Sequence, residues 1–227
     1  GVLPKRWGKT RLYHGAPWVE RLQRPYTVTK GLQGRHLSVW ASHGRYYKEE
    51  KKAWEWQRPS LYCTTEDLFT QTIVVPFLIP MLENAGAVVF SPRERDWQAH
   101  ETIVDNDTPE RGGTYTEKGN KYPWENAGEG FAWLKTTYVD GENPFHDGTA
   151  RYAHAVSKKS QSSEIRWTPD IPEEGRYAVY VSYATLPNSV PDARYVVRHK
   201  GVSTTFKVNQ KMGGGTWVYL GTFEFGK

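Results

Sequence analysis

The chain has 227 residues, of which 14% are aromatic, and it carries a formal net charge of +5 at pH 7. Ten Trp and fourteen Tyr exclude an intrinsically disordered chain, which is poor in aromatic residues, and favour strands packed around a sizeable core. The basic residues are spread along the chain without a Lys/Arg block, so we expect no nucleic-acid partner. No apolar stretch approaches the roughly 20 residues of a membrane span, and the single Cys63 excludes an intrachain disulfide.

Residues 1–34 are predicted to form an irregular N-terminal arm, because proline and glycine recur between basic and aromatic residues. Residues 35–41 (RHLSVWA) predict a buried strand. The charged and aromatic segment 45–60 follows, and we interpret it as an excursion, with a hairpin over the end of that strand as one form it could take.

Residues 64–86 predict a helix that Thr64 or Thr65 caps and that Gly86 ends. Pro76 and Pro80 conflict with an unbroken helix, because proline lacks the amide hydrogen and clashes with the preceding turn. They predict a kink or a break.

Residues 87–92 (AVVFSP) predict a second short buried strand. Strand, helix and strand in this order are typical of a parallel sheet with helices on its faces. The sequence therefore predicts a partial α/β segment over 35–104.

The composition changes after about residue 104, where a turn-rich stretch leads into short strands with alternating side chains. We predict strands at 163–169, 175–184, 193–200, 202–210 and 216–225. Strands this short and closely spaced predict an all-β sandwich or jelly roll over 105–227. The predicted fold class is thus α/β, with a partial parallel sheet and helices, plus an all-β domain.

His43 follows the first predicted strand, and Glu66 lies in the first turn of the predicted helix. The carboxyl end of a parallel strand and the start of the next helix lie at the same edge of a sheet, so these side chains could converge on one ion. Zinc accepts imidazole and carboxylate ligands. Spacing alone favours a histidine in a turn and an acid that pairs with the helix dipole, and it gives only weak support to a metal site.

The segments RHLSVWASHG and TTEDLFTQTIVVPFLIPMLENAGAVVFSPRERD resemble the first half of the type-3 family of zinc-dependent N-acetylmuramoyl-L-alanine amidases. The resemblance covers roughly 33–96, with Ser-His-Gly-Arg where the family has GHGG. It implies that His43 and Glu66 are the first two zinc ligands. The family also needs a third histidine ligand and a catalytic glutamate, and we expect both beyond Lys227. The chain's own catalytic residues are therefore unknown, and the chain by itself is expected to be inactive.

The second half, about 115–225, resembles golvesin C-terminal-like domains, also called xanthan-lyase binding-type domains. The motifs that carry the resemblance are P.IPE.G.Y.VYV.Y, A.Y.V.H.G, V.Q and W..LG.F.F, in this order. Such modules are found in secreted Bacteroidetes enzymes. The resemblance implies a secreted, periplasmic or cell-surface protein whose partners are a cell-wall glycan or other polysaccharide and the remainder of its parent polypeptide.

Together these patterns predict a fragment of a secreted, zinc-dependent peptidoglycan amidase-like hydrolase with an inserted β domain of the glycan-binding type. Two alternatives stay open. The first is a non-catalytic cell-surface protein for glycan binding or assembly. The second is a polysaccharide lyase, such as a xanthan lyase, or a glycosidase. Whether the chain is an enzyme is left open.

Overall fold

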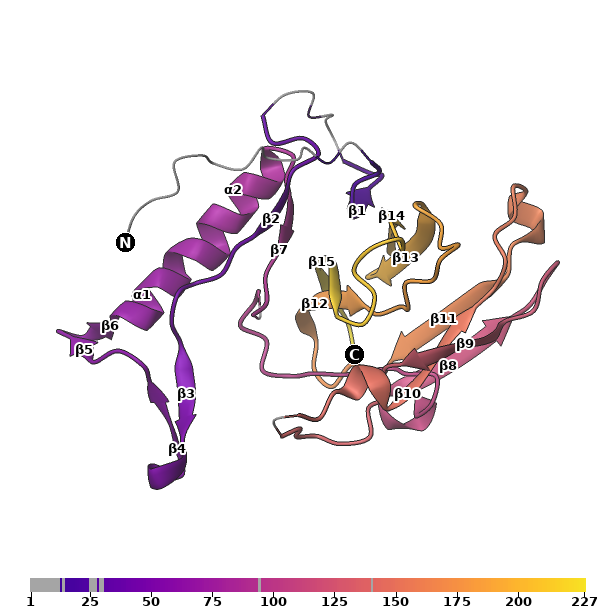
Figure 1. Ribbon diagram of the computed structural model, residues 1–227. Coiled ribbons are helices and arrows are strands. Elements are labelled where there is room, and N and C mark those ends of the chain that lie inside the picture. The colour runs from indigo at the N-terminus through magenta and orange to yellow at the C-terminus, as the bar shows by residue number, and fades with distance from the viewer. Residues whose placement is uncertain (1–12, 14, 25–27, 29–30, 94, 140) are drawn as a thin grey trace, which may run out of the picture. The chain divides into compact units, whose positions relative to one another are not determined.

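A computed structural model describes residues 13, 15–24, 28, 31–93, 95–139 and 141–227 (Figure 1). The chain divides into two compact units, the first made of Gly1–Pro17 and Arg24–Arg95 and the second of Trp18–Gln23 and Asp96–Lys227. Much of the predicted N-terminal arm lies outside the described residues. In the described part of the chain, no helix is long and apolar enough to cross a membrane.

The first unit is built on two parallel strands, β2 (His36–Ser38) and β7 (Val88–Phe90). Leu37 lies opposite Val89 in this register. A helical segment connects the strands and lies along them (Figure 1). Buried Ile79 of that segment packs with Val89, so one helix face and one sheet face form the small core of this unit.

The helical segment consists of α1 (Glu66–Ile73), a π-helical stretch η2 (Val74–Leu78) and α2 (Ile79–Asn84). Thr65 is the N-cap, since its Oγ1 accepts a hydrogen bond from Leu68 N at 3.1 Å. The π-helical stretch contains Pro76, which has no amide hydrogen to donate. A π-helical turn is a known form of local irregularity within an α-helix, so the break predicted at Pro76 takes the form of a π-helical stretch inside an otherwise continuous helix.

Gly86 ends the helix, as predicted. Its φ angle is +101°, a left-handed conformation that favours glycine. The Gly86 amide donates to Glu83 O at 3.0 Å, and the Ala87 amide donates to Leu82 O at 3.0 Å. These two bonds form a Schellman motif and satisfy the last helical carbonyls.

Two small hairpins complete the first unit. β3 (Arg45–Lys48) pairs with β4 (Ala53–Trp56) through the 3-10 turn η1 (Glu49–Lys51), so the hairpin considered for 45–60 is present. β5 (Ser60–Leu61) pairs with β6 (Thr64–Thr65) immediately before α1.

The second unit consists of antiparallel strands, as predicted for an all-β domain. Its strands are β1 (Val19–Arg21), β8 (Gly113–Lys118), β9 (Glu125–Gly130), β10 (Gly148–Tyr152), β11 (Glu164–Pro169), β12 (Gly175–Val181), β13 (Ala193–His199), β14 (Val202–Val208) and β15 (Val218–Phe225). Three 3-10 turns are η3 (Pro109–Arg111), η4 (Pro144–His146) and η5 (Lys159–Gln161). The pairings are β1–β14–β13, β9–β10, β8–β11 and β12–β15. The five strands predicted after residue 162 are present, whereas β1, β8, β9 and β10 lie in segments for which no strand is predicted.

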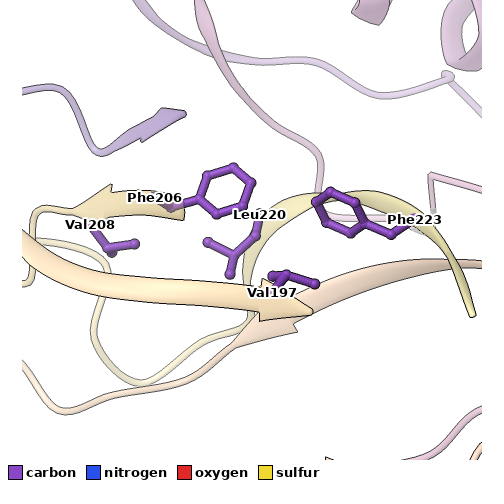
Figure 2. Close-up of a cluster of buried hydrophobic side chains, with 5 residues drawn as sticks. All are labelled: Val197, Phe206, Val208, Leu220 and Phe223. Atoms are coloured by element: carbon purple, nitrogen blue, oxygen red, sulfur yellow. The ribbon is translucent and has the colours of Figure 1, made fainter. Parts of the chain in front are cut away.

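The core of the second unit is formed by β13, β14 and β15 (Figure 2). Its buried side chains are Val197, Phe206, Val208, Leu220 and Phe223. Leu220 and Phe223 both face this core although they are three positions apart, because the register between β12 and β15 shifts at Leu220. An extra residue at a β-bulge reverses the side-chain parity of the strand beyond it.

A loop that precedes η3 fixes β10 through carboxylates. Asp107 Oδ2 accepts a hydrogen bond from Thr149 N at 2.6 Å, and Asp107 Oδ1 accepts one from Thr149 Oγ1 at 2.8 Å. The Asp107 amide donates to Asp105 Oδ2 at 3.1 Å. Asp105 is only 7% exposed, and this burial raises the pKa of its carboxyl to about 6.

Truncation of Phe206 should be among the most destabilising changes in the second unit. Phe206 is 1% exposed and meets Phe223 with ring centroids 6.1 Å apart, so Phe206→Ala should lower the free energy of unfolding by about 3 to 5 kcal/mol. Val196→Ala, on the same strand pair but 52% exposed, should change it by less than about 0.5 kcal/mol. Urea unfolding followed by near-UV circular dichroism measures both. Equal midpoints for the two variants would contradict the assignment of the core.

Asp105 should make the stability of the second unit fall as the pH rises. The pKa of its carboxyl is higher in the folded state than its ordinary value of 3.8, so the folded protein binds the proton more tightly than the unfolded chain. The free energy of unfolding should therefore drop by about 2 to 3 kcal/mol between about pH 4 and pH 7. Asp105→Asn keeps an acceptor for the Asp107 amide but cannot ionise. The unfolding free energy of the wild type minus that of this variant should therefore decrease as the pH rises across that interval. A difference that does not change with pH would contradict a buried carboxyl with a raised pKa.

Candidate functional site

The first candidate site is formed by His43, which follows β2, and by the first turn of α1. His43 Nδ1 lies 3.7 Å from Oε1 of Glu66 and 3.7 Å from Oδ1 of Asp67. The capped helix start places both carboxylates at the end of the strand from which the histidine emerges. The structure therefore brings together the two residues that the sequence proposes as ligands, His43 and Glu66, and it adds a second acidic group, Asp67.

Asp67 is the residue that sequence reasoning missed at this site. Its side chain is fully buried at 0% exposure, whereas that of Glu66 is 57% exposed. Asp67 Oδ2 accepts a hydrogen bond from the Arg58 amide at 2.8 Å, and Asp67 Oδ1 has no hydrogen-bond partner among the described residues. In the sequence, two acids in a first helical turn fit the dipole equally well, so only tertiary burial distinguishes them.

Arg58 contacts both nitrogens of the histidine ring. Its Nε donates to His43 Nδ1 at 3.4 Å, and its Nη2 lies 3.1 Å from His43 Nε2. A ring nitrogen that accepts from Arg58 uses the lone pair that a metal ion would need. Within the described ranges, no three His, Cys, Asp or Glu side chains are grouped so that they could hold a metal ion. These residues alone therefore do not fit a complete zinc site.

Four further histidines, which could be considered as a third ligand, have other surroundings. His100 Nε2 lies 2.9 Å from Glu173 Oε2, and His146 Nδ1 lies 2.5 Å from Glu129 Oε2. His199 Nε2 lies 3.1 Å from Thr204 Oγ1, and the His154 ring contacts Tyr122 at 5.2 Å between centroids. All four lie in the second unit.

The second candidate site lies on the two-stranded ribbon β8–β11. Trp167 of β11 lies opposite Tyr115 of β8, with ring centroids 6.1 Å apart. It stacks on Tyr195 of β13 at 6.5 Å and an interplanar angle of 15°. Trp167 is nevertheless 42% exposed, so two aromatic neighbours hold an indole ring that is still open to solvent.

A fixed ion pair lies on the same side of the ribbon as Trp167. Arg151 of β10 binds Glu117 of β8 through two bonds, Nε to Oε1 at 2.7 Å and Nη2 to Oε2 at 3.0 Å. The Tyr115 hydroxyl also donates to Glu117. The Arg151 guanidinium holds the pKa of the Glu117 carboxyl below its usual value, and burial raises the pKa of Tyr115. We call Tyr115, Glu117, Arg151, Trp167 and Tyr195 the Trp167 face.

The opposite side of the ribbon is polar and slightly hollowed. A depression of about 240 Å³ is lined by Thr116, Lys118, Glu164 and Arg166. In the antiparallel register Lys118 lies opposite Glu164, and Thr116 lies opposite Arg166. The ribbon therefore carries aromatic rings on one side and alternating charges on the other.

The chain is similar to known proteins over part of its length. Residues 124–227 match the family model of the golvesin C-terminal domain, which confirms the resemblance of this half. The xanthan lyase of Bacillus sp. (strain GL1) is 32% identical over 76 residues, which make up 34% of this chain and 8% of that protein. The solved structure of a Paenibacillus xanthan lyase shows 27% identity over 49% of this chain and 9% of that chain, with a TM-score of 0.34. The chain thus spans less than a tenth of the length of either relative. The amidase resemblance of the first half stays a prediction.

Proposed function

We propose that the second unit binds a polysaccharide and that Trp167 provides the surface on which a sugar ring stacks. We infer a polysaccharide ligand mainly from the match of 124–227 to the golvesin C-terminal domain. The similarity to part of a xanthan lyase supports the same ligand class. On this reading the chain belongs to a secreted, periplasmic or cell-surface protein. Its partners are a polysaccharide or cell-wall glycan and the remainder of its parent polypeptide.

The chemistry of the Trp167 face supports this proposal. The C–H groups on one face of a pyranose ring pack against an aromatic plane, and the sugar hydroxyls around the ring need donors and acceptors. The indole of Trp167 is 42% exposed, and the Arg151–Glu117 pair beside it is already oriented. Because these groups are held before the ligand arrives, little side-chain entropy is lost on binding.

Removal of the Trp167 ring should weaken polysaccharide binding while the fold is kept. In native gels that contain xanthan, wild-type protein should be retarded, and Trp167→Ala should weaken the apparent affinity by about tenfold or more. Trp97→Ala is the matched control, because Trp97 lies in the second unit and is 67% exposed but is not part of the ribbon. Equal retardation of both variants would place binding elsewhere. Wild-type migration unaffected by xanthan, hyaluronan or peptidoglycan fragments would refute the proposal.

A second candidate function is supported by the geometry around His43. A fully buried Asp67 oxygen without a hydrogen-bond partner, 3.7 Å from His43 Nδ1, is a costly arrangement that a cation would relieve. We propose that His43 and Glu66 are two ligands of a zinc ion in an amidase-like hydrolase and that the missing ligand and the general base come from outside the described residues. Zinc, when bound, would supply an activated water for amide hydrolysis. His43 and Glu66 would hold the ion in place. Arg58 would have to move away from the imidazole, because it now contacts the ring nitrogens that could bind the ion.

Metal analysis of the complete parent polypeptide tests this second candidate. We expect about one zinc ion per chain, since three protein ligands with an open position are typical of hydrolytic zinc sites. His43→Ala should lose the metal. His100→Ala should keep it, because His100 pairs with Glu173 in the other unit. A folded wild-type polypeptide without zinc would leave polysaccharide binding as the only proposed function.

A further inference from the structure

The hairpin β3–β4 has two chemically different faces. In its register Arg45 lies opposite Trp56, and Tyr47 lies opposite Trp54. Because side chains alternate along a strand, these four residues share one face, and we call them the aromatic face. The other face carries Tyr46 opposite Glu55 and Lys48 opposite Ala53.

The aromatic face is exposed to solvent. Trp54 is 64% exposed and Tyr47 is 45% exposed. The two rings contact each other edge to face, with centroids 5.7 Å apart and an interplanar angle of 67°. Neighbouring rings that fix each other but remain in water are typical of a binding surface, since their burial against a ligand would release the hydrating water.

The charge on this face identifies the kind of ligand. Arg45 is its single charged residue, and its guanidinium carbon lies 4.8 Å from the ring centroid of Trp56. Among the described residues, no ion pair engages Arg45. On the other face, by contrast, Lys48 Nζ lies 3.9 Å from Glu55 Oε2. A ligand that offers apolar ring faces to the aromatic residues and a carboxylate to Arg45 satisfies both features.

The turn of the hairpin argues against a membrane as the occupant. Residues 49–52 are Glu, Glu, Lys and Lys, and all four are exposed. A hairpin that inserts into a bilayer needs an apolar tip, because charged groups are costly to bury in the hydrocarbon region. Here the apolar groups lie along the strands and the charges lie at the tip.

The base of the hairpin is tied to the His43 site. The Gln57 amide donates to Gly44 O at 3.1 Å, and the Arg58 amide donates to the buried Asp67 carboxylate at 2.8 Å. Arg45 follows directly after the His43–Gly44 turn. The aromatic face therefore begins where the His43 and Glu66 side chains lie.

We propose that the aromatic face of β3–β4 binds a segment of an acidic polysaccharide, with sugar rings on Trp54 and Tyr47 and a uronate carboxylate on Arg45. The proposal takes its ligand class from the proposed polysaccharide-binding function and adds a second glycan surface, in the first unit. A glycan held on this face extends toward His43 and Glu66.

Calorimetric titration of the full chain with oligosaccharides of glucuronic acid tests the proposal, in a Trp167→Ala background that removes the Trp167 face. Trp54→Ala should weaken the residual binding by about tenfold, the size expected for loss of one stacked ring. Tyr46→Ala is the matched control, since Tyr46 is 43% exposed on the other face. Arg45→Gln should weaken binding of the glucuronate oligomer and leave binding of cello-oligosaccharides unchanged. Far-UV circular dichroism of each variant shows whether the fold is retained.

The outcomes separate this inference from the proposed function. If Trp167→Ala alone abolishes binding, no residual binding is left for Trp54→Ala to weaken. The aromatic face is then not a glycan surface, and the proposed function stands. If the wild-type chain binds neither oligomer nor polymer, the proposed function fails and the inference fails with it. If Trp54→Ala instead abolishes binding to phosphatidylglycerol vesicles and not to the oligomers, a membrane is the occupant and the inference is overturned.

Discussion

The register between β8 and β11 determines what the second unit can bind. It places Trp167 opposite Tyr115 and Lys118 opposite Glu164, so that one side of the ribbon is aromatic and the other is charged. A slip by one residue would exchange the two sides completely, because side chains alternate along each strand. The stacking of Trp167 on Tyr195 of β13 fixes the ribbon against the β13–β14 sheet, and the paired Arg151 and Glu117 complete the same side. Polysaccharide binding by this unit depends on that register.

In the first unit, the buried Asp67 carboxylate has the equivalent role. One of its oxygens accepts the Arg58 amide and thereby joins the hairpin base to the start of α1, while the other faces His43 without a hydrogen bond. An uncompensated buried acceptor costs about 1–3 kcal/mol, and such a cost is tolerated in proteins mainly where it serves a site. The same carboxylate thus connects the two surfaces that we consider in this unit, the His43 cluster and the aromatic face of β3–β4.

Much of the fold was accessible from the sequence because local signals and tertiary packing agree. The cap at Thr65 and the stop at Gly86 are local chemistry, and the conflict caused by Pro76 is resolved locally by the π-helical stretch. The convergence of His43 and Glu66 followed from the topology of a strand and the next helix. By contrast, β9 (ENAGEG) has too few apolar or β-branched residues to be distinguished from a turn. The burial of Asp67 and the open ring of Trp167 arise from neighbours distant in sequence, which no local pattern contains.

Hydrogen–deuterium exchange of the chain with and without a bound acidic polysaccharide would test the central claim most directly. If the second unit is a polysaccharide-binding domain, amides of β8, β10 and β11 should exchange more slowly in the presence of the polymer, because the ligand covers the Trp167 face and stabilises the ribbon. The core strands β14 and β15 should change little. Unchanged exchange across 96–227 at a polymer concentration that retards the protein in native gels would contradict the claim and would place binding outside this unit.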